Sequence, residues 1–195
     1  IGVHAKSKAP HGAKDDEDAV RLQIANRRKQ LAQCEWIRRR VDQHLDEDQH
    51  VIVLGDFNDG DHAVSSAVIT GERPFKNYAW MLRHDATSPR DRYTDAENIQ
   101  ITEDIERVRL HSAERQFVRK SARDMVYTAA FGGNYESIDQ IYISRHFIEN
   151  TPNSIGQMDY FSVLNDHLTD GSHPEAPYNK LASDHGQIMA HMSLT

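Results

Sequence analysis

The chain has 195 residues, a formal net charge of −7 and a pI near 5.9. This length suits one domain with its own core, and no internal repeat suggests an array of modules. The acidic charge argues against a protein that grips nucleic acid through general electrostatics, because neutralising phosphates needs clustered Lys and Arg. A nucleic-acid substrate would be held only locally.

Cysteine content and hydropathy bear on the compartment. The single cysteine, Cys34, cannot form an internal disulfide, so nothing requires an oxidising environment. We expect a cytoplasmic location, while secretion stays open. No stretch approaches the ~20 apolar residues that cross a bilayer. The chain starts at Ile1 with neither an initiator Met nor a signal peptide, and we therefore expect that upstream sequence has been lost.

The first seventy residues alternate between strand and helix patterns. Residues 1–7 alternate apolar and polar side chains and predict a short strand with His4 near its end. Residues 51–54 form a continuous apolar run, typical of a strand buried on both faces, and a short helix is expected near 62–69. Between the strands, residues 16–46 predict an amphipathic helix. Its expected packed face consists of Val20, Ile24, Leu31, Cys34, Ile37, Val41 and Leu45.

The second half of the chain is richer in strand patterns. The stretch 102–123 is polar and Arg-rich and has no clear pattern. Residues 125–131 and 137–144 are two β-rich runs separated by Gly-Gly-Asn, which predicts an antiparallel hairpin. Further strands are expected at 158–164 and 186–192.

A short polar motif, Gly55-Asp-Phe-Asn-Asp59, follows the buried strand directly. A turn there places Asp56 and Asn58 at the strand's end, where their oxygen atoms project. Oxygen ligands of this kind suit Mg²⁺ or Mn²⁺. The alternative is an ordinary Asp/Asn turn that caps the next helix.

A second motif, Ser183-Asp-His-Gly186, places a carboxylate next to an imidazole at the start of the last expected strand. Histidine readily takes a proton near neutral pH when a partner fixes its tautomer. Asp139 is the candidate partner for His185, because an unpaired carboxylate between apolar residues is costly. Taken singly, His185 is better interpreted as a structural histidine, and Asp139 could equally face water on an edge strand.

A third motif is His4-Ala-Lys-Ser-Lys8 near the chain start. A histidine at a strand end with ammonium groups nearby can bind phosphate and stabilise negative charge as a bond breaks. The alternative is a solvated strand.

Together, the order and rough spacing of these motifs resemble the endonuclease/exonuclease/phosphatase superfamily of metal-dependent phosphoesterases. The resemblance covers essentially the whole chain, with 61–123 least well matched. The motifs that carry it are His4-Ala-Lys-Ser-Lys8, Arg27-x-x-Gln30, Gly55-Asp-Phe-Asn-Asp59, Ser137-Ile-Asp-Gln-Ile141 and Ser183-Asp-His-Gly186.

The resemblance implies a four-layer αββα sandwich with mixed, largely antiparallel sheets and a metal site at one edge. By the family's pattern, His185 is the general base that activates water, and Asp139 holds it. Asp184 is associated with the metal, while Asp56 and Asn58 orient the nucleophile, the metal or the phosphate. His4 binds the scissile phosphate, with Lys6 and Asn58 as further phosphate ligands. The cofactor implied is Mg²⁺ or Mn²⁺, and the substrate is a phosphoester, possibly DNA or RNA.

One departure from the family matters. An upstream Asn and the Glu that is a principal metal ligand would precede residue 1. The acidic run Asp15-Asp-Glu-Asp18 is no substitute, because it opens a helix. We therefore expect residues 1–195 to be a single domain that lacks the N-terminal part of the fold and is inactive alone. An apolar sheet face would be left for a second copy, aggregation or another segment to cover.

Other functions stay open at this stage. Within the family, the substrate could instead be a sugar, inositol or lipid phosphate. The Arg-rich stretch with Arg107, Arg109, Arg115, Arg119, Lys120 and Arg123 could contact nucleic acid or form a solvated helix with paired charges. A non-catalytic binding module would be expected to have lost part of the motif set, which is intact here. A zinc site is disfavoured, because no close His/Cys set lies on one element.

Overall fold

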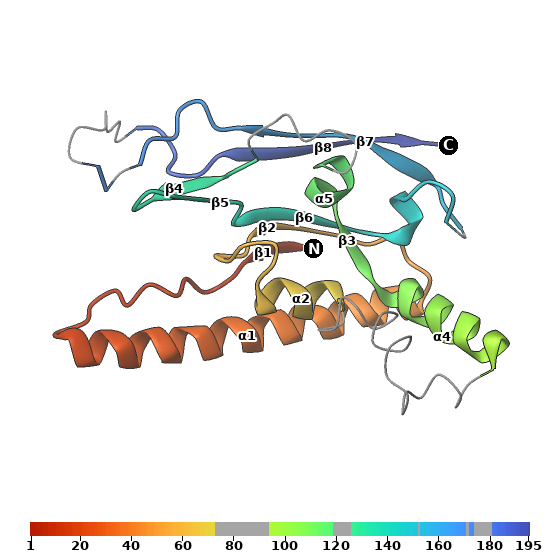
Figure 1. The fold of residues 1–195 in the computed structure, drawn as a ribbon, viewed down its shortest axis with the longest axis horizontal. Helices are drawn as coiled ribbons and strands as arrows, with labels where there is room; N and C mark the ends of the chain where they lie inside the picture. Colours follow the sequence, from red (N-terminus) through yellow and green to blue (C-terminus); the bar gives the residue numbers. More distant parts are fainter. Residues whose placement is uncertain (73–93, 119–125, 152, 171, 174–180) are drawn as a thin grey trace.

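Helices and strands are mixed along the chain, and its sheets contain both parallel and antiparallel pairs (Figure 1). This confirms the expected α+β class. The computed structural model describes residues 1–72, 94–118, 126–151, 153–170, 172–173 and 181–195.

The main sheet has four strands in the order β1-β2-β6-β3. Strand β1 (Gly2–His4) runs parallel to β2 (Ile52–Asp56), and β6 (Asp139–Ser144) runs antiparallel to β2. Strand β3 (Leu110–Ser112) pairs antiparallel with the far side of β6. As a result, the ends of β1 and β2 and the beginning of β6 lie at one edge of the sheet.

Both faces of this sheet are covered, and β6 shows why its sequence is almost continuously apolar. Successive side chains of a strand point to opposite faces. Tyr142 packs with the helix-side core, whereas Ile141 and Ile143 pack with the core on the other face. A strand buried on both faces reads as an apolar run, and the same logic explains β2.

Helices α1 (Asp16–Asp46) and α2 (Val64–Thr70) cover one face of the sheet (Figure 1). The Asp15 side chain accepts a hydrogen bond from the Asp18 backbone N–H and so caps α1. Helix α4 (Asp95–Val108) begins with a capping box between Thr94 and Glu97. The buried cluster between α1, α2 and the main sheet contains Cys34, Val41, Leu45, Val51, Val53, Phe57, Ile69, Leu110 and Tyr142.

A second sheet covers the opposite face. It consists of β7 (Gly156–Leu164) and β8 (Gln187–Leu194), paired antiparallel, with α5 (Ala113–Val118) and the 3₁₀ turn η2 (Arg145–Phe147) beside it. These two strands confirm the expectation for the C-terminal region. The cluster between the sheets contains Ala113, Phe117, Ile141, Ile143, Phe147, Met158 and Phe161.

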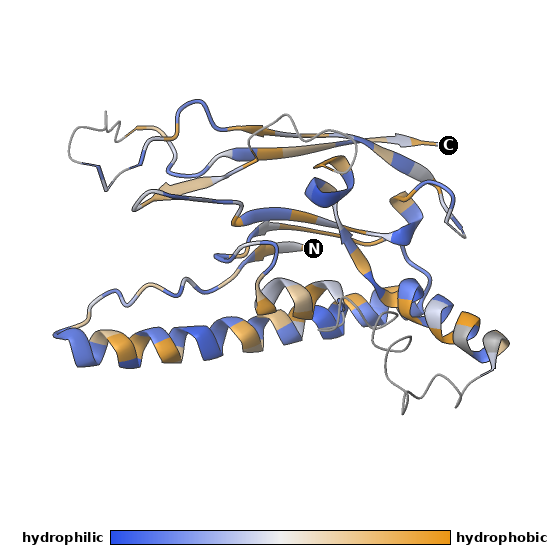
Figure 2. Cartoon of the chain, viewed as in Figure 1, coloured by the Kyte–Doolittle hydropathy of each residue, from blue (hydrophilic) through white to orange (hydrophobic). Residues whose placement is uncertain are grey.

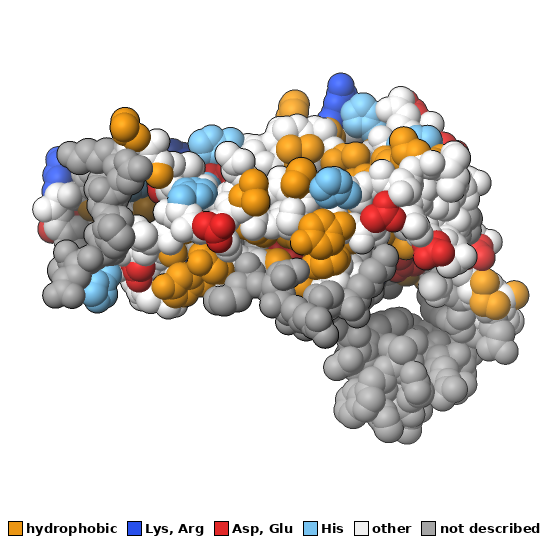
Figure 3. All heavy atoms as spheres, turned by 90° about the horizontal axis from the view of Figure 1, so that it is seen from above, with side chains coloured by type: hydrophobic (Ala, Val, Ile, Leu, Met, Phe, Trp, Pro, Cys, Tyr) orange, Lys and Arg blue, Asp and Glu red, His pale blue; other side chains and the backbone are white. Residues whose placement is uncertain are grey.

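The outer face of the β7–β8 sheet is exposed and carries hydrophobic and histidine side chains (Figure 3). Tyr160, Leu164 and Met189 are each at least 44% exposed. An apolar sheet face was expected from the sequence. Its covering by a second copy of the chain stays a prediction.

The expected packed face of α1 is right only in its C-terminal half. Val20 and Ile24 are 58% and 48% exposed, and hydrophobic turns are visible in that part of the helix (Figure 2). Polar Asn26 and Gln30 are buried in their place. The reason is that this half of α1 packs on loops instead of on the apolar sheet. In the described part of the chain, no helix is long and apolar enough to cross a membrane.

The predicted hairpin is correct in its turn and wrong in its second strand. Gly132 and Gly133, both with positive φ, join β4 (Ala129–Phe131) to β5 (Asn134–Glu136). Two glycines in this conformation allow a two-residue turn, so Ala129 pairs with Glu136. The chain then leaves the hairpin and enters the main sheet as β6.

The Arg-rich stretch contains charge pairs within the protein, as the solvated-helix alternative expects. Arg107 lies 3.3 Å from Asp46, and Arg109 lies 3.0 Å from Glu106. Arg119, Lys120 and Arg123 lie outside the described residues.

Candidate functional site

Strand register brings three of the expected site residues into one row at the sheet edge. His4 is the register partner of Asp56 across the parallel β1–β2 pair, and Asp56 faces Asp139 across the antiparallel β2–β6 pair. These residues are the last of β1, the last of β2 and the first of β6. Their side chains therefore start from adjacent backbone positions.

Gly55 permits the close approach of β1 to β2 at this edge. Its φ is +136°, and a Cβ atom there would lie 2.0 Å from the carbonyl oxygen of Val3. Any larger residue would therefore push β1 away from β2. The glycine before Asp56 is needed to keep His4 and Asp56 in register.

The turn after β2 is held by a dense set of hydrogen bonds. Asn58, at φ 51°, donates its backbone N–H to Asp56 Oδ1 at 2.7 Å and its side-chain amide to Asp56 Oδ2 at 2.8 Å. The same amide donates to the Ala5 carbonyl at 3.0 Å. From α1, Gln30 donates to the carbonyls of Phe57 and Asn58. Buried Gln30 thus fixes the turn that orients Asp56.

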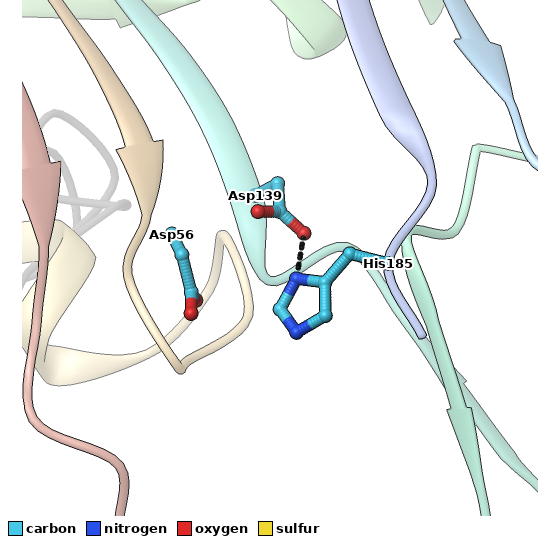
Figure 4. Close-up of side chains that lie close together, drawn as sticks. All are labelled: Asp56, Asp139 and His185. Atoms are coloured by element: carbon cyan, nitrogen blue, oxygen red, sulfur yellow. Dashed lines mark hydrogen bonds and ion pairs between the residues drawn. The ribbon is translucent and has the colours of Figure 1, made fainter. Parts of the chain in front are cut away.

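His185 reaches the row from the second sheet, just before β8. Its Nδ1 lies 2.8 Å from Asp139 Oδ2, and one ligand atom each of Asp56, Asp139 and His185 lie within 4.8 Å of one another. Figure 4 shows the imidazole beside Asp139 with the Asp56 carboxylate facing them. The side chains of Asp139 and His185 are 15% and 31% exposed, so solvent reaches the site.

The charges of the cluster shift the pKa values of two members. Burial lowers the pKa of His185, but Asp139, through its charge and hydrogen bond, and then Asp56 and Asp184 outweigh burial, so the net pKa is raised. The pKa of Asp56 is also raised, chiefly by burial and partly by the Asp139 charge, against the hydrogen bond from Asn58. Two carboxylates thus share a partly buried site.

This donor set fits a divalent metal. Two carboxylates and an imidazole converge, and the Asp56 carboxylate, whose pKa is raised chiefly by burial and partly by the Asp139 charge, would be stabilised in its ionised form by a cation. Mg²⁺ and Mn²⁺ favour oxygen ligands and are commonly held by one or two carboxylates.

Thr128 joins the two sheets at the site and was missed from the sequence. Its buried hydroxyl accepts hydrogen bonds from the backbone N–H groups of Ile138 and Asp139, both at 3.0 Å. Its carbonyl accepts from the Gly186 N–H at 2.8 Å. One side chain and its backbone therefore position the segments that carry Asp139 and His185. A single Thr in a strand pattern gives no sequence signal for this role.

Three expected site residues lie at the margin of the cluster. His4 is 82% exposed, with Nε2 3.5 Å from Asp56 Oδ2. Asp184 is exposed beside His185 and is not one of the three converging residues. Lys6 is fixed through its backbone N–H, which donates to Gln33 Oε1 at 2.8 Å. Their expected roles in metal and phosphate binding stay predictions.

A scan against models of protein families finds no match for this chain, and a search among curated proteins finds none either.

Proposed function

We propose that this chain carries the hydrolytic site of a divalent-metal-dependent phosphoester hydrolase, most closely a nuclease-like phosphodiesterase. The observation that carries the proposal is the 2.8 Å contact between His185 Nδ1 and Asp139, with Asp56 alongside. A histidine whose Nδ1 is held by a carboxylate presents Nε2 to a water molecule. The neighbouring carboxylate supplies the metal ligand that phosphoester chemistry needs.

In the proposed reaction, His185 Nε2 takes a proton from water as the water oxygen attacks phosphorus in line. Asp139 stabilises the imidazolium that forms, which agrees in sign with the raised pKa of His185. The new P–O bond replaces the ester P–O bond, and the departing oxygen takes a proton from His4 or from solvent. A divalent metal held by Asp56 would neutralise negative charge on the phosphate.

The chain's other residues position these groups. Asp56 is the metal ligand with the firmest support, because Asn58 and Gln30 fix its turn. The Asn58 side-chain amide donates hydrogen bonds to Asp56 and to the Ala5 carbonyl. The first role of Asn58 is therefore to orient Asp56, and contact of Asn58 with phosphate is secondary. The His4 side chain is exposed at the rim of the site, so a phosphate oxygen can reach it.

We infer membership of the endonuclease/exonuclease/phosphatase superfamily from the motif set together with this placement. The proposed four-layer αββα arrangement is supported by the stacking order of the layers, which is helices, then the mixed main sheet, then the second sheet (Figure 1). The family's pattern also includes a metal-ligating Glu, and such a carboxylate would complete the metal site.

The proposal is tested by hydrolysis of plasmid DNA and of bis-p-nitrophenyl phosphate with Mg²⁺ or Mn²⁺. The assay uses this chain and a version extended upstream, each with His185→Ala. His191→Ala serves as the matched control, because His191 is an exposed histidine on β8. The extended protein should hydrolyse at least one substrate, His185→Ala should abolish the activity, and His191→Ala should retain it.

Two outcomes would overturn the proposal. If the extended protein cuts neither substrate with either metal, a phosphodiesterase is ruled out in favour of a small-molecule phosphatase or a binding module. If His185→Ala remains as active as His191→Ala, the activity does not belong to this site.

A further inference from the structure

A cavity of about 660 Å³ opens beside the candidate site. Its lining includes Ser137, two residues before Asp139, and Asp59, three residues after Asp56. The neighbouring walls come from α5 and from β5, through Glu114 and Tyr135. The cavity therefore lies at the same edge of the main sheet as the cluster, and its volume falls in the range typical of small-molecule sites.

The charges of the lining disfavour a second phosphate. Lys8 is neutralised by Asp59 at 2.6 Å, and Arg115 contacts Asp61 through Nε and Glu72 at 2.9 Å. Among the described lining residues, the Lys8 and Arg115 side chains are therefore already paired.

Two carboxylates of the lining are left over. Among the residues that the structure describes, Glu114 and Glu136 have no ion-pair partner. Burial raises the pKa of Glu114, against a hydrogen bond with Ser137, and nearby Asp61 raises it further. A ligand that donates N–H groups would satisfy Glu114, whereas an anion would be repelled.

Tyr135 is an aromatic side chain among the described lining residues. Tyr135 is 53% exposed, and its ring packs edge-on against Tyr127 with centroids 4.9 Å apart. This edge-on contact holds the Tyr135 ring in place but does not cover its face. A planar ligand ring can therefore stack on that face. A single aromatic wall suits stacking of a flat ring, whereas a quaternary ammonium favours a cage of several rings.

We propose that this cavity binds a nucleobase with an exocyclic amino group, stacked on Tyr135 and hydrogen-bonded to Glu114. The inference rests on the proposed function, because it names the part of the phosphoester substrate next to the scissile group. Carboxylate side chains recognise the amino group of cytosine in this way, and aromatic stacking accepts any base. The cavity thus selects bases that carry an amine over those that carry only carbonyl groups.

The test is calorimetric binding of cytidine and uridine to the metal-free protein. The cytidine base carries an exocyclic amino group where the uridine base carries a carbonyl oxygen, and neither nucleoside contains phosphate. Cytidine should bind about tenfold more tightly than uridine. Glu114→Gln should remove that preference, and Tyr135→Ala should weaken both ligands by about tenfold.

The matched control is Glu103→Gln, an exposed carboxylate on α4. This variant should bind both nucleosides like the wild type. Equal affinity for the two nucleosides, no binding at millimolar concentration, or an unchanged Tyr135→Ala variant would each overturn the proposal.

Failure of this inference is separable from failure of the proposed function. Nucleoside binding needs neither metal nor His185, whereas bis-p-nitrophenyl phosphate has no base, so its hydrolysis should survive Glu114→Gln and Tyr135→Ala. If the cavity serves a nucleic acid, the preference for cytosine over uracil should persist in cleavage of short oligonucleotides. If it serves free nucleotides, the preference should appear only with mononucleotides.

Discussion

His185 Nδ1 lies 2.8 Å from Asp139 Oδ2, although the two residues are 46 positions apart and belong to segments of different sheets. Asp139 begins a strand of the main sheet, and His185 precedes a strand of the second sheet. The pair therefore forms only when the two sheets pack. Loss of that packing and loss of the proposed activity should coincide.

The protonation of His185 is the first testable consequence. Its pKa is raised above the ordinary value of 6.5 mainly because Asp139 outweighs the effect of burial. Asp139→Asn should therefore lower the pKa of His185, as measured by NMR titration of the metal-free protein. The pair should also stabilise the fold below pH 6.5 and lose that contribution as pH rises through the raised pKa. An unchanged titration of His185 in the variant would show that Asp139 is not its partner in solution.

Thr128 should be essential for positioning Asp139 and His185, and valine, which has the same shape but no hydroxyl, should not replace it. Thr128→Val removes the acceptor for the Ile138 and Asp139 N–H groups, which should destabilise the protein by roughly 1–3 kcal/mol in denaturant unfolding. Thr128→Ser keeps the hydroxyl, so its free energy of unfolding should fall much less. The His185 pKa should move toward its ordinary value in Thr128→Val only. Equal behaviour of the two variants would leave the hydroxyl without a positioning role.

Gly55 should tolerate no side chain. Gly55→Ala combines a positive φ with a Cβ atom 2.0 Å from a backbone oxygen, so unfolding free energy should fall by at least about 2 kcal/mol. Gly60→Ala is the matched control, because nothing lies within 4 Å of its added Cβ atom. Comparable stability of the two variants in thermal unfolding would contradict the close approach of β1 and β2.

A divalent metal should stabilise the folded chain through Asp56. Binding to the folded state raises the unfolding temperature by mass action, so excess Mn²⁺ should raise Tm and a chelator should reverse the rise. The shift should be smaller in Asp56→Asn and unchanged in Asp46→Asn, whose carboxylate is exposed and pairs with Arg107. Equal Mn²⁺ shifts in both variants would place the metal elsewhere.

Local pattern was sufficient to predict much of the fold. The helix at 16–46 and the strands after residue 50 and residue 155 were predicted because their periodicity and punctuation are local. The partner of 129–131 was not predicted, because two β-rich runs across a turn do not reveal that 134–136 pairs with 129–131 while the second run, 137–144, joins the main sheet.

The same limit applies to the site. Asp56, Asp139 and His185 were predicted from local motifs. Strand register places Asp56 beside Asp139, whereas packing of the two sheets brings His185 to them. Burial of Asn26 and Gln30 in place of Val20 and Ile24 was not predicted, because amphipathic spacing does not show that half of α1 packs on loops. Thr128 was missed for a similar reason: its role comes from backbone groups that three segments bring together.

The central claim is that His185, held by Asp139, is the base of a metal-dependent hydrolysis. The most direct measurement is the pH dependence of bis-p-nitrophenyl phosphate hydrolysis by the upstream-extended protein with Mn²⁺. The rate should rise with pH through the pKa of His185, and His185→Ala should lose that rise together with most of the rate. A pH profile shared by the wild type and His185→Ala would show that His185 is not the base.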